Sequence, residues 1–253
     1  MYDLCVNLKS SKEKDLKLAI KRIFELGWDC VAWTTSVNGR VTSNHLKPVK
    51  NIVMEPIHLR DALQLRSLAN NKSAITDVRQ LNRITITVDD MMDAQMLTLG
   101  NATLNHFDII AVRPGNIKVM AHLCKTADID IITLDFTHRL PFSINKKLLD
   151  EAMLRGIYFE IIYSPILSSA SGLRQETFSN TRVLIQYLRG RNILLSSGAD
   201  NVGQFRGPMD VCNIGKHFIQ VLSFRIRRQI TKLEKSLEGI KLNEESVDVS
   251  SQR

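Results

Sequence analysis

Paired cysteines, signal peptides and membrane spans are missing from this sequence. Its four cysteines, Cys5, Cys30, Cys124 and Cys212, include no Cys-x-x-Cys pair, which argues against a disulfide framework and against a zinc knuckle. No stretch approaches the roughly 20 apolar residues that a membrane-spanning helix needs, and the first residues lack a basic segment followed by an apolar one. We therefore expect a protein of a reducing compartment without a membrane segment.

Histidine motifs typical of metal centres are also missing. A catalytic divalent metal needs several imidazoles and carboxylates that converge on one point. The six histidines show neither His-x-His nor His-Glu-x-x-His spacing; they are His45, His58, His106, His122, His138 and His217. The sequence thus predicts no complete metal site and favours surface or structural roles for these histidines.

Aromatic residues are few, at 6% of 253 residues, so we expect an aliphatic core. The hydrophobic content of 44% and the charged content of 24% are ordinary for a globular protein. Positive charge is in excess, because 34 Lys and Arg residues stand against 26 Asp and Glu residues and give a net charge of +8. This excess favours a polyanionic partner such as nucleic acid, and the alternative is a mildly basic surface without a binding role.

Seven short runs rich in Val, Ile and Leu predict seven β-strands. Amphipathic stretches of helical length lie between most of them, such as KEKDLKLAIKRIFELG, which Gly27 should end. Ser143 and Ser179 are the predicted N-caps of two later helices. Repeated β-α units in a chain of this length predict a parallel α/β barrel of the TIM type. The runs are DLCVNL (3–8), DCVAWTT (29–35), RITITV (83–88), FDIIAV (107–112), DIITLDF (130–136), IYFEIIY (157–163) and NILLSS (192–197).

Two segments depart from this rhythm. Residues 36–81 form a long interval whose only further strand candidate is VKNIVM, 49–54. From Arg225 onward the chain is strongly basic and then polar without an apolar period, which predicts a basic helix and a disordered end. We therefore predict one barrel domain over 1–224 and a basic C-terminal tail over 225–253.

The opening strand carries polar residues on one side. Leu4 and Val6 alternate with Asp3, Cys5 and Asn7, so a carboxylate, a thiol and an amide should share a face. Chemistry in a parallel barrel takes place at the C-terminal ends of the strands. Further polar candidates there are Asp135, His138, Glu160, Ser164, Ser196, Ser197 and Asp200.

Two stretches resemble the polymerase and histidinol phosphatase (PHP) superfamily of metal-dependent phosphoesterases. YDLCVN is similar to its D-L-H-x-H strand, with Cys5 and Asn7 at the two histidine positions. LLSSGAD is similar to its S-S-D-A-H segment, with Gly198 in place of the aspartate and Asp200 in place of the histidine. The resemblance implies a PHP-like barrel whose metal site is degenerate at these positions and at Asp3.

A second resemblance covers residues 159–215 closely. The blocks FEIIYSP, NILLSSGA and FRGPMDVCNIG resemble, in order and spacing, the thirty-kilodalton protein subunit of ribonuclease P and ribonuclease MRP. A thinner similarity extends to LNRITITV, FDIIAVRP and LPFSINKKLLDEAMLRG.

That family resemblance implies an RNA-binding, noncatalytic subunit that supports removal of the 5′ leader from precursor tRNA by the RNA subunit. It implies no cofactor on this chain and no membrane, with magnesium serving the reaction of the RNA. The implied partners are ribonuclease P RNA, ribonuclease MRP RNA, precursor tRNA through the particle, and other protein subunits including a small α/β protein. The implied location is the nucleus and nucleolus.

Arg206 is the leading candidate for RNA contact. Gly207 can serve as an N-cap and Pro208 suits the first position of a helix, so a guanidinium would lie beside backbone N–H groups that bind phosphate. The alternative is that Arg206 holds the turn by pairing with Asp210 or Asp200. The other predicted RNA-binding residues are Arg83, Arg113, Arg174, Arg189 and Arg225.

Two other functions stay open at this point. A metal-dependent phosphoesterase could use an atypical set, namely Asp3, Cys5, Asp135, Glu160 and Asp200. Against this, the family resemblance favours Glu160 as a structural partner of an interior Arg or hydroxyl group. Ser196 and Ser197 are expected to line the core, because no G-x-S-x-G motif surrounds them and no histidine is placed to activate them. The third possibility is a barrel that holds proteins together without contacting RNA.

Overall fold

The structure, a computed structural model, describes residues 1–7, 13–42, 78–98, 100–168 and 170–218. Each of the seven predicted runs overlaps a strand, so those predictions are confirmed. The seven strands lie in chain order and pair in parallel. They are β1 (Tyr2–Val6), β2 (Cys30–Asn38), β3 (Arg79–Val88), β4 (Ile109–Pro114), β5 (Ile131–Thr133), β6 (Tyr158–Ile162) and β7 (Ile193–Ser196).

The sheet curls into a nearly closed barrel. The end of β1 meets the segment that follows β7 through an isolated parallel bridge between Val6 and Ala199. At this seam the Asn7 N–H donates to the Ala199 carbonyl at 2.9 Å, and the Gly198 N–H donates to the Cys5 carbonyl at 2.8 Å. The predicted TIM-like α/β barrel is thus confirmed, with seven strands in the described residues.

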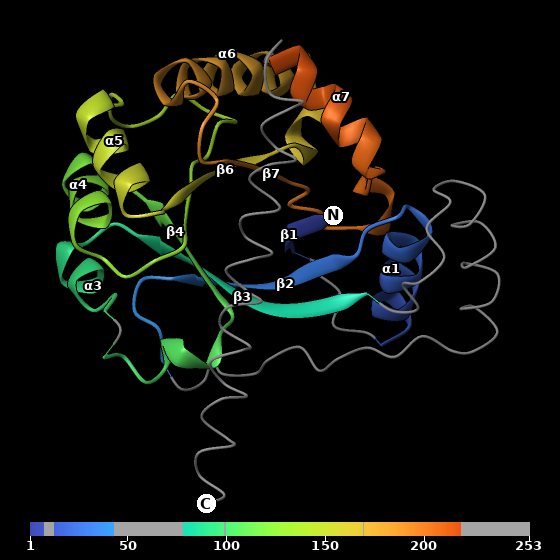
Figure 1. The fold of residues 1–253 in the computed structure, drawn as a ribbon, viewed down its shortest axis with the longest axis horizontal. Helices are drawn as coiled ribbons and strands as arrows, with labels where there is room; N and C mark the ends of the chain where they lie inside the picture. Colours follow the sequence, from blue (N-terminus) through green and yellow to red (C-terminus); the bar gives the residue numbers. More distant parts are fainter. Residues whose placement is uncertain (8–12, 43–77, 99, 169, 219–253) are drawn as a thin grey trace, which may run out of the picture.

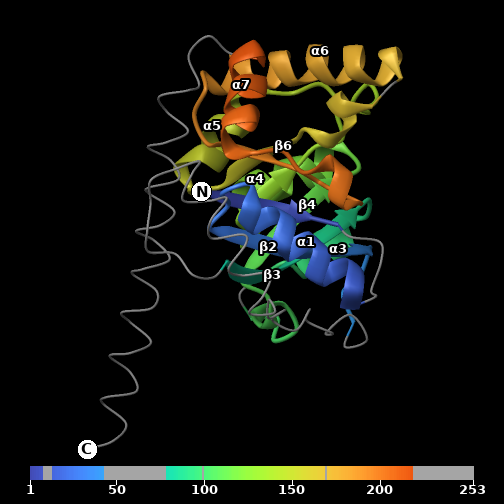
Figure 2. The same cartoon turned by 90° about the vertical axis from the view of Figure 1, so that its right-hand side faces the viewer.

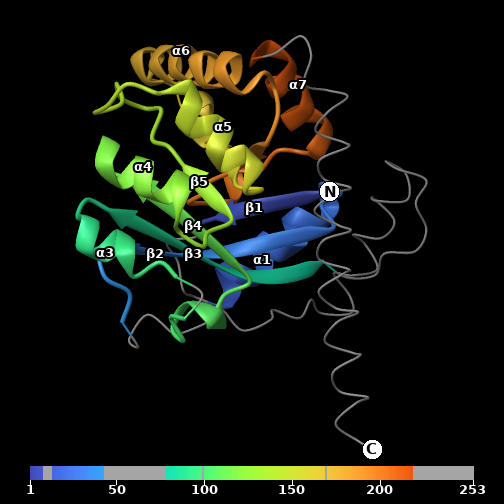
Figure 3. The ribbon, with the colours of Figure 1, turned by 60° about the vertical axis from the view of Figure 1, so that its left-hand side comes forward.

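Helices surround the strands (Figure 1). They are α1 (Glu13–Glu25), α3 (Met91–Gln95), α4 (Ile117–Lys125), α5 (Lys146–Leu154), α6 (Ser171–Leu188) and α7 (Pro208–Phe218), with short 3-10 turns η2 (Leu104–His106), η3 (Ser164–Leu167) and η4 (Val202–Gln204). Figure 2 shows α1 in front of the strands, and Figure 3 shows α3, α4, α5 and α6 following one another around the outside. In the described part of the chain, no helix has the length and apolarity to cross a membrane.

Two predicted helix starts are wrong. Asn145 caps α5 in place of Ser143, because its side chain accepts a hydrogen bond from the Lys147 N–H at 2.9 Å. Ser179 lies inside α6, which begins at Ser171 without a side-chain cap. The predicted end of α1 is confirmed, since Gly27 adopts a φ of 90° after it.

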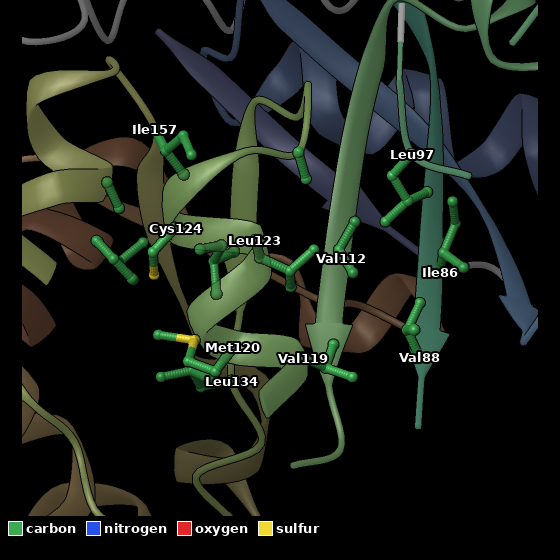
Figure 4. Close-up of a cluster of buried hydrophobic side chains, with 14 of the residues drawn as sticks. Ile86, Val88, Leu97, Val112, Val119, Met120, Leu123, Cys124, Leu134 and Ile157 are labelled. Carbon is green, nitrogen blue, oxygen red and sulfur yellow. The ribbon is translucent and has the colours of Figure 1, made fainter. Parts of the chain in front are cut away.

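The largest core cluster lies between the strands and the helices α3, α4, α5 and α6, and Figure 4 shows part of it. It is mostly aliphatic, as the composition predicts. Ile86 and Val88 of β3 and Val112 of β4 face Val119 and Leu123 of α4 there.

A second cluster packs α1 against β1, β2 and the start of α7. A third cluster takes its fully buried members from strands alone, so it fills one end of the barrel interior. Its members are Leu4, Ala32, Ile109, Ala111, Ile131 and Leu194.

Several predictions fall on residues that the structure does not describe. These are the VKNIVM strand at 49–54, the basic helix and tail at 225–253, and the RNA-binding role of Arg225.

Candidate functional site

The centre of the barrel holds a buried ion pair. Arg83 of β3 and Glu160 of β6 both have 0% of their surface exposed. The two guanidinium Nη atoms donate to the two carboxylate oxygens, at 2.5 and 2.6 Å. Arg83 also donates through Nη1 to the Leu4 carbonyl at 2.6 Å and through Nε to Thr85 Oγ1 at 3.0 Å. One side chain therefore joins β1, β3 and β6 across the barrel.

The electrostatics of this pair keep both groups charged. Burial alone would raise the pKa of Glu160, but the charge and hydrogen bonds of Arg83 hold it below its ordinary value. The hydroxyls of Thr133 and Ser196 lie near enough to add to this lowering of the pKa, although neither has a hydrogen bond of regular geometry. The expectation that Glu160 pairs with an interior arginine is confirmed. The prediction that Arg83 contacts RNA is wrong, because its side chain has no exposed surface.

Asp3 and Cys5 do not form one polar face, because the pairing register of β1 shifts between Asp3 and Val6. Asp3 lies at the seam with β7, where Oδ1 accepts from the Ser197 N–H at 2.9 Å and Oδ2 has no hydrogen-bond partner. Cys5 lies beside Thr34, whose hydroxyl donates to the sulfur at 3.7 Å. Burial raises the pKa of the Cys5 thiol to about 12, so the thiol is neutral and a poor metal ligand.

The Asp3 carboxyl makes folding stability depend on pH. Burial raises its pKa from 3.8 to about 6. The folded state therefore binds this proton more tightly than the unfolded state, and the stability gained from protonation disappears as pH rises from about 4 to about 6.

Asp3→Asn removes this titration, while its side-chain oxygen can still accept a hydrogen bond from the Ser197 N–H. We expect the unfolding free energy of Asp3→Asn, relative to the unsubstituted chain, to rise by about 3 kcal/mol between pH 3 and pH 7. Urea unfolding at several pH values measures this difference, and a difference independent of pH would contradict it.

The late stretch of the resemblance to phosphoesterases also folds without a metal-ligand geometry. Gly198 has a φ of 58°, and a Cβ atom built on it would lie 2.3 Å from Ile162 Cγ2. A side chain does not fit at this position, whatever its chemistry. Asp200 is half-buried, and its N–H donates to Gln204 Oε1 at 2.7 Å.

No three His, Cys, Asp or Glu side chains of the described residues are grouped so that they could hold a metal ion. The atypical set that the phosphoesterase alternative requires therefore does not come together. Ser197 is not a nucleophile candidate either, since it is buried and its hydroxyl donates to the Cys5 carbonyl at 3.0 Å. Ser196 is buried beside the ion pair, so both serines line the core as expected.

Arg206 precedes α7, whose first residue is Pro208, as predicted. Its Nη1 donates to the Gly203 carbonyl at 2.9 Å and to the Phe205 carbonyl at 2.8 Å. The guanidinium thus holds the turn, as in the alternative prediction, and the partners that it binds here are backbone carbonyls.

The backbone of Arg206 is anchored as well. Its carbonyl accepts from Trp28 Nε1 at 2.9 Å, and its N–H donates to the Tyr163 hydroxyl at 3.3 Å. Neither aromatic residue was singled out from the sequence, although Tyr163 belongs to the FEIIYSP block. These contacts fix the arginine at one place beside the helix N-terminus.

The remaining predicted arginines lie at separate places. Arg174 and Arg189 are exposed on and just after α6, and Arg189 adopts a φ of 53° as its C-cap. Arg113 is half-buried at the end of β4, and its Nε has no hydrogen-bond partner. Phosphate contact through these residues stays a prediction.

Comparisons with known proteins agree with this architecture. The chain is 32% identical to Protein GAMETOPHYTE DEFECTIVE 1 of Arabidopsis thaliana over 252 residues, which cover 96% of this chain and 43% of that protein. It is 32% identical to ribonuclease P protein subunit p30 of Mus musculus over 181 residues, which cover 70% of this chain and 66% of that protein. The chain thus spans less than two thirds of the length of these relatives.

A solved structure shares the fold. A protein chain in the cryo-EM structure of archaeal ribonuclease P with mature tRNA superposes with a TM-score of 0.62 at 15% identity, over 92% of this chain and 88% of that chain. The model of the family described as RNase P subunit p30 matches residues 1–221. The chain therefore belongs to the RNase P subunit p30 family.

Proposed function

We propose that this chain is a noncatalytic, RNA-binding protein subunit of ribonuclease P and that ribonuclease MRP shares it. Family membership supports the subunit role. The observation that carries the noncatalytic role is the ion pair of Arg83 and Glu160, because the centre of the barrel already holds a cation of its own, fixed by a bidentate carboxylate. Such a pair supplies neither an open coordination position nor a free general base.

The proposed assembly follows from this role. The chain would bind ribonuclease P RNA and ribonuclease MRP RNA, reach precursor tRNA through the particle, and contact other protein subunits, including a small α/β protein. It would bind no cofactor, and magnesium would serve the RNA-catalysed removal of the 5′ leader. The place of action would be the nucleus and nucleolus.

RNA binding would be largely electrostatic. The chain carries a net charge of +8. Arg174 and Arg182 are exposed on α6, and their positive charge adds to the charge of Arg206. Each phosphate neutralised by Lys or Arg releases counterions, so the affinity should fall steeply with salt.

Arg206→Ala tests the proposed phosphate site. We expect this variant to lower the affinity for ribonuclease P RNA by about 1 to 3 kcal/mol, because a charge-assisted contact is lost beside the N-terminus of α7. Filter binding at fixed salt measures the change, and Arg191→Ala, an exposed arginine after α6, is the control. Because Arg206 also donates to two backbone carbonyls, its loss could disturb the fold, so circular dichroism must show that the variant is folded. A folded Arg206→Ala chain with unchanged affinity would rule out the phosphate contact.

The subunit role itself is tested by purifying the tagged chain from its own cells and sequencing the RNA that accompanies it. The proposal predicts one or two dominant structured RNAs. Recovery of other ribonuclease P proteins without direct RNA crosslinks to this chain would favour the protein-only scaffold. Recovery of neither would refute membership in the particle.

A further inference from the structure

A small cavity opens at the C-terminal end of the barrel, where β4, β5 and β6 end. We call it the β4–β6 cavity; its volume is about 170 Å³. Its lining includes Arg113, Asp135, Phe136, Ile162, Pro165 and Thr177. Barrels of this type bind their ligands at this end, and neither the ion pair of Arg83 and Glu160 nor Arg206 lines the cavity.

The walls of the β4–β6 cavity are mainly apolar, and Arg113 and Asp135 are its two charged residues. Phe136, Ile162 and Pro165 supply apolar surface. Arg113 is a donor whose Nε is buried and has no hydrogen-bond partner. Asp135 is an acceptor whose Oδ1 accepts from the Thr137 N–H at 3.0 Å and from its hydroxyl at 2.5 Å. Within the described residues, no hydrogen bond engages Asp135 Oδ2.

The charges of the cavity argue against phosphate as its ligand. Burial would raise the pKa of Asp135, but the bonds from Thr137 and the nearby Arg113 charge hold it below its ordinary value. The carboxylate is therefore ionised and repels a phosphate. A ligand that has both an acceptor and a donor on one edge suits Arg113 and Asp135 together.

The volume of the cavity limits the size of the ligand that it can hold. An apolar cavity of about 150 Å³ takes one benzene ring, so this volume suits one six-membered ring. Unpaired RNA bases are bound in this way, between apolar walls and polar groups that reach their edges. Cytosine offers acceptors at N3 and O2 beside an amine donor at N4, which is the group that carboxylates accept from.

We propose that the β4–β6 cavity binds a single unstacked pyrimidine base of RNA, with cytosine preferred. This inference rests on the proposed RNA-binding function and adds a base-reading contact to it. Arg113 donates to the ring acceptors, Asp135 accepts from the exocyclic amine, and the apolar walls enclose the ring.

Fluorescence anisotropy of the full chain with labelled RNA hexamers tests the cavity. The probes are a cytidine hexamer, an adenosine hexamer and a hexamer of abasic ribose phosphates, all of equal charge. We expect the cytidine hexamer to bind about tenfold more tightly than the abasic one, from stacking and edge contacts. Equal affinities for cytidine and abasic hexamers would overturn the inference, as would tighter binding of adenosine than of cytidine.

Two variants separate a base from a phosphate. Asp135→Asn keeps the oxygen that accepts the Thr137 bonds but removes the negative charge. If the cavity binds a base, this variant should bind the cytidine hexamer more weakly. Tighter binding of the cytidine hexamer by the variant would indicate a phosphate ligand and overturn the inference. Thr177→Leu fills the cavity without changing the charge and should abolish the preference for cytidine over abasic RNA, whereas Ser179→Leu, at an exposed position of the same helix, should keep it. A preference that survives in a folded Thr177→Leu chain would place the base elsewhere.

The failure of this inference is distinguishable from failure of the subunit role. If the chain purifies with ribonuclease P RNA but shows no base preference, only the inference fails. If the chain purifies without that RNA, the proposed function fails, whatever the hexamers show.

Discussion

Glu160→Gln is expected to lower the free energy of unfolding by about 3 to 5 kcal/mol, the largest loss that we predict for a single substitution in the barrel. The variant leaves the Arg83 guanidinium buried without a counter-charge, and an arginine cannot lose its proton to escape this cost. A loss of this size is a large part of the total stability of a typical domain. Chemical unfolding followed by circular dichroism measures it.

Two controls separate the buried pair from ordinary surface charge. Asp150→Asn breaks the exposed pair of Lys146 and Asp150 in α5 and should cost less than about 1 kcal/mol. Replacing both buried partners, with Arg83→Met and Glu160→Leu together, should cost less than Glu160→Gln alone, because no unpaired charge remains. If the free energy of unfolding of Glu160→Gln lies within about 1 kcal/mol of that of the unsubstituted chain, the ion pair does not stabilise the barrel centre.

Gly198→Ala is the second substitution with a large expected effect. At a φ of 58° an alanine costs about 1 to 2 kcal/mol. Its Cβ would also lie 2.3 Å from Ile162 Cγ2, and overpacking of this kind adds about 1 to 3 kcal/mol. The damage falls on the seam of the barrel, because the Gly198 N–H bonds the Cys5 carbonyl.

Gly156→Ala is the matched control for this prediction. Gly156 has a φ of 86°, and nothing lies within 4 Å of a Cβ built on it. It therefore shares the backbone cost of Gly198 but not the collision with Ile162. Thermal unfolding should show a clearly larger loss for Gly198→Ala, and equal losses would mean that the seam can open to admit a methyl group.

The strands could be predicted because the chain marks them strongly. In RITITV, Ile84, Ile86 and Val88 lie in the core beneath the helices, and the alternating run of Val and Ile reveals the strand. The same alternation could also have predicted the buried position of Arg83. A barrel strand is buried on both faces, so Arg83 and Thr85, on the opposite face, had to lie in the interior.

The rest of the site depended on information that is not local in the sequence. Arg83 meets Glu160 from a strand 77 positions away, and only the closed barrel brings them together. Asp3 and Cys5 separate because β1 shifts register, which strand alternation alone cannot reveal. Ser143 was predicted to cap α5, but Asn145 lies only two residues later and suits the position as well, so residue type alone does not locate the cap.

We propose that the barrel serves an RNA catalyst and does not hydrolyse phosphoesters itself. The most direct test is the cleavage of precursor tRNA by the particle purified through this chain, with and without prior digestion by micrococcal nuclease and removal of that nuclease. We predict removal of the 5′ leader by the untreated particle and complete loss of that activity after digestion, with no activity in the purified chain alone. Leader removal that survives digestion, or cleavage by the chain alone with added metal, would contradict the account.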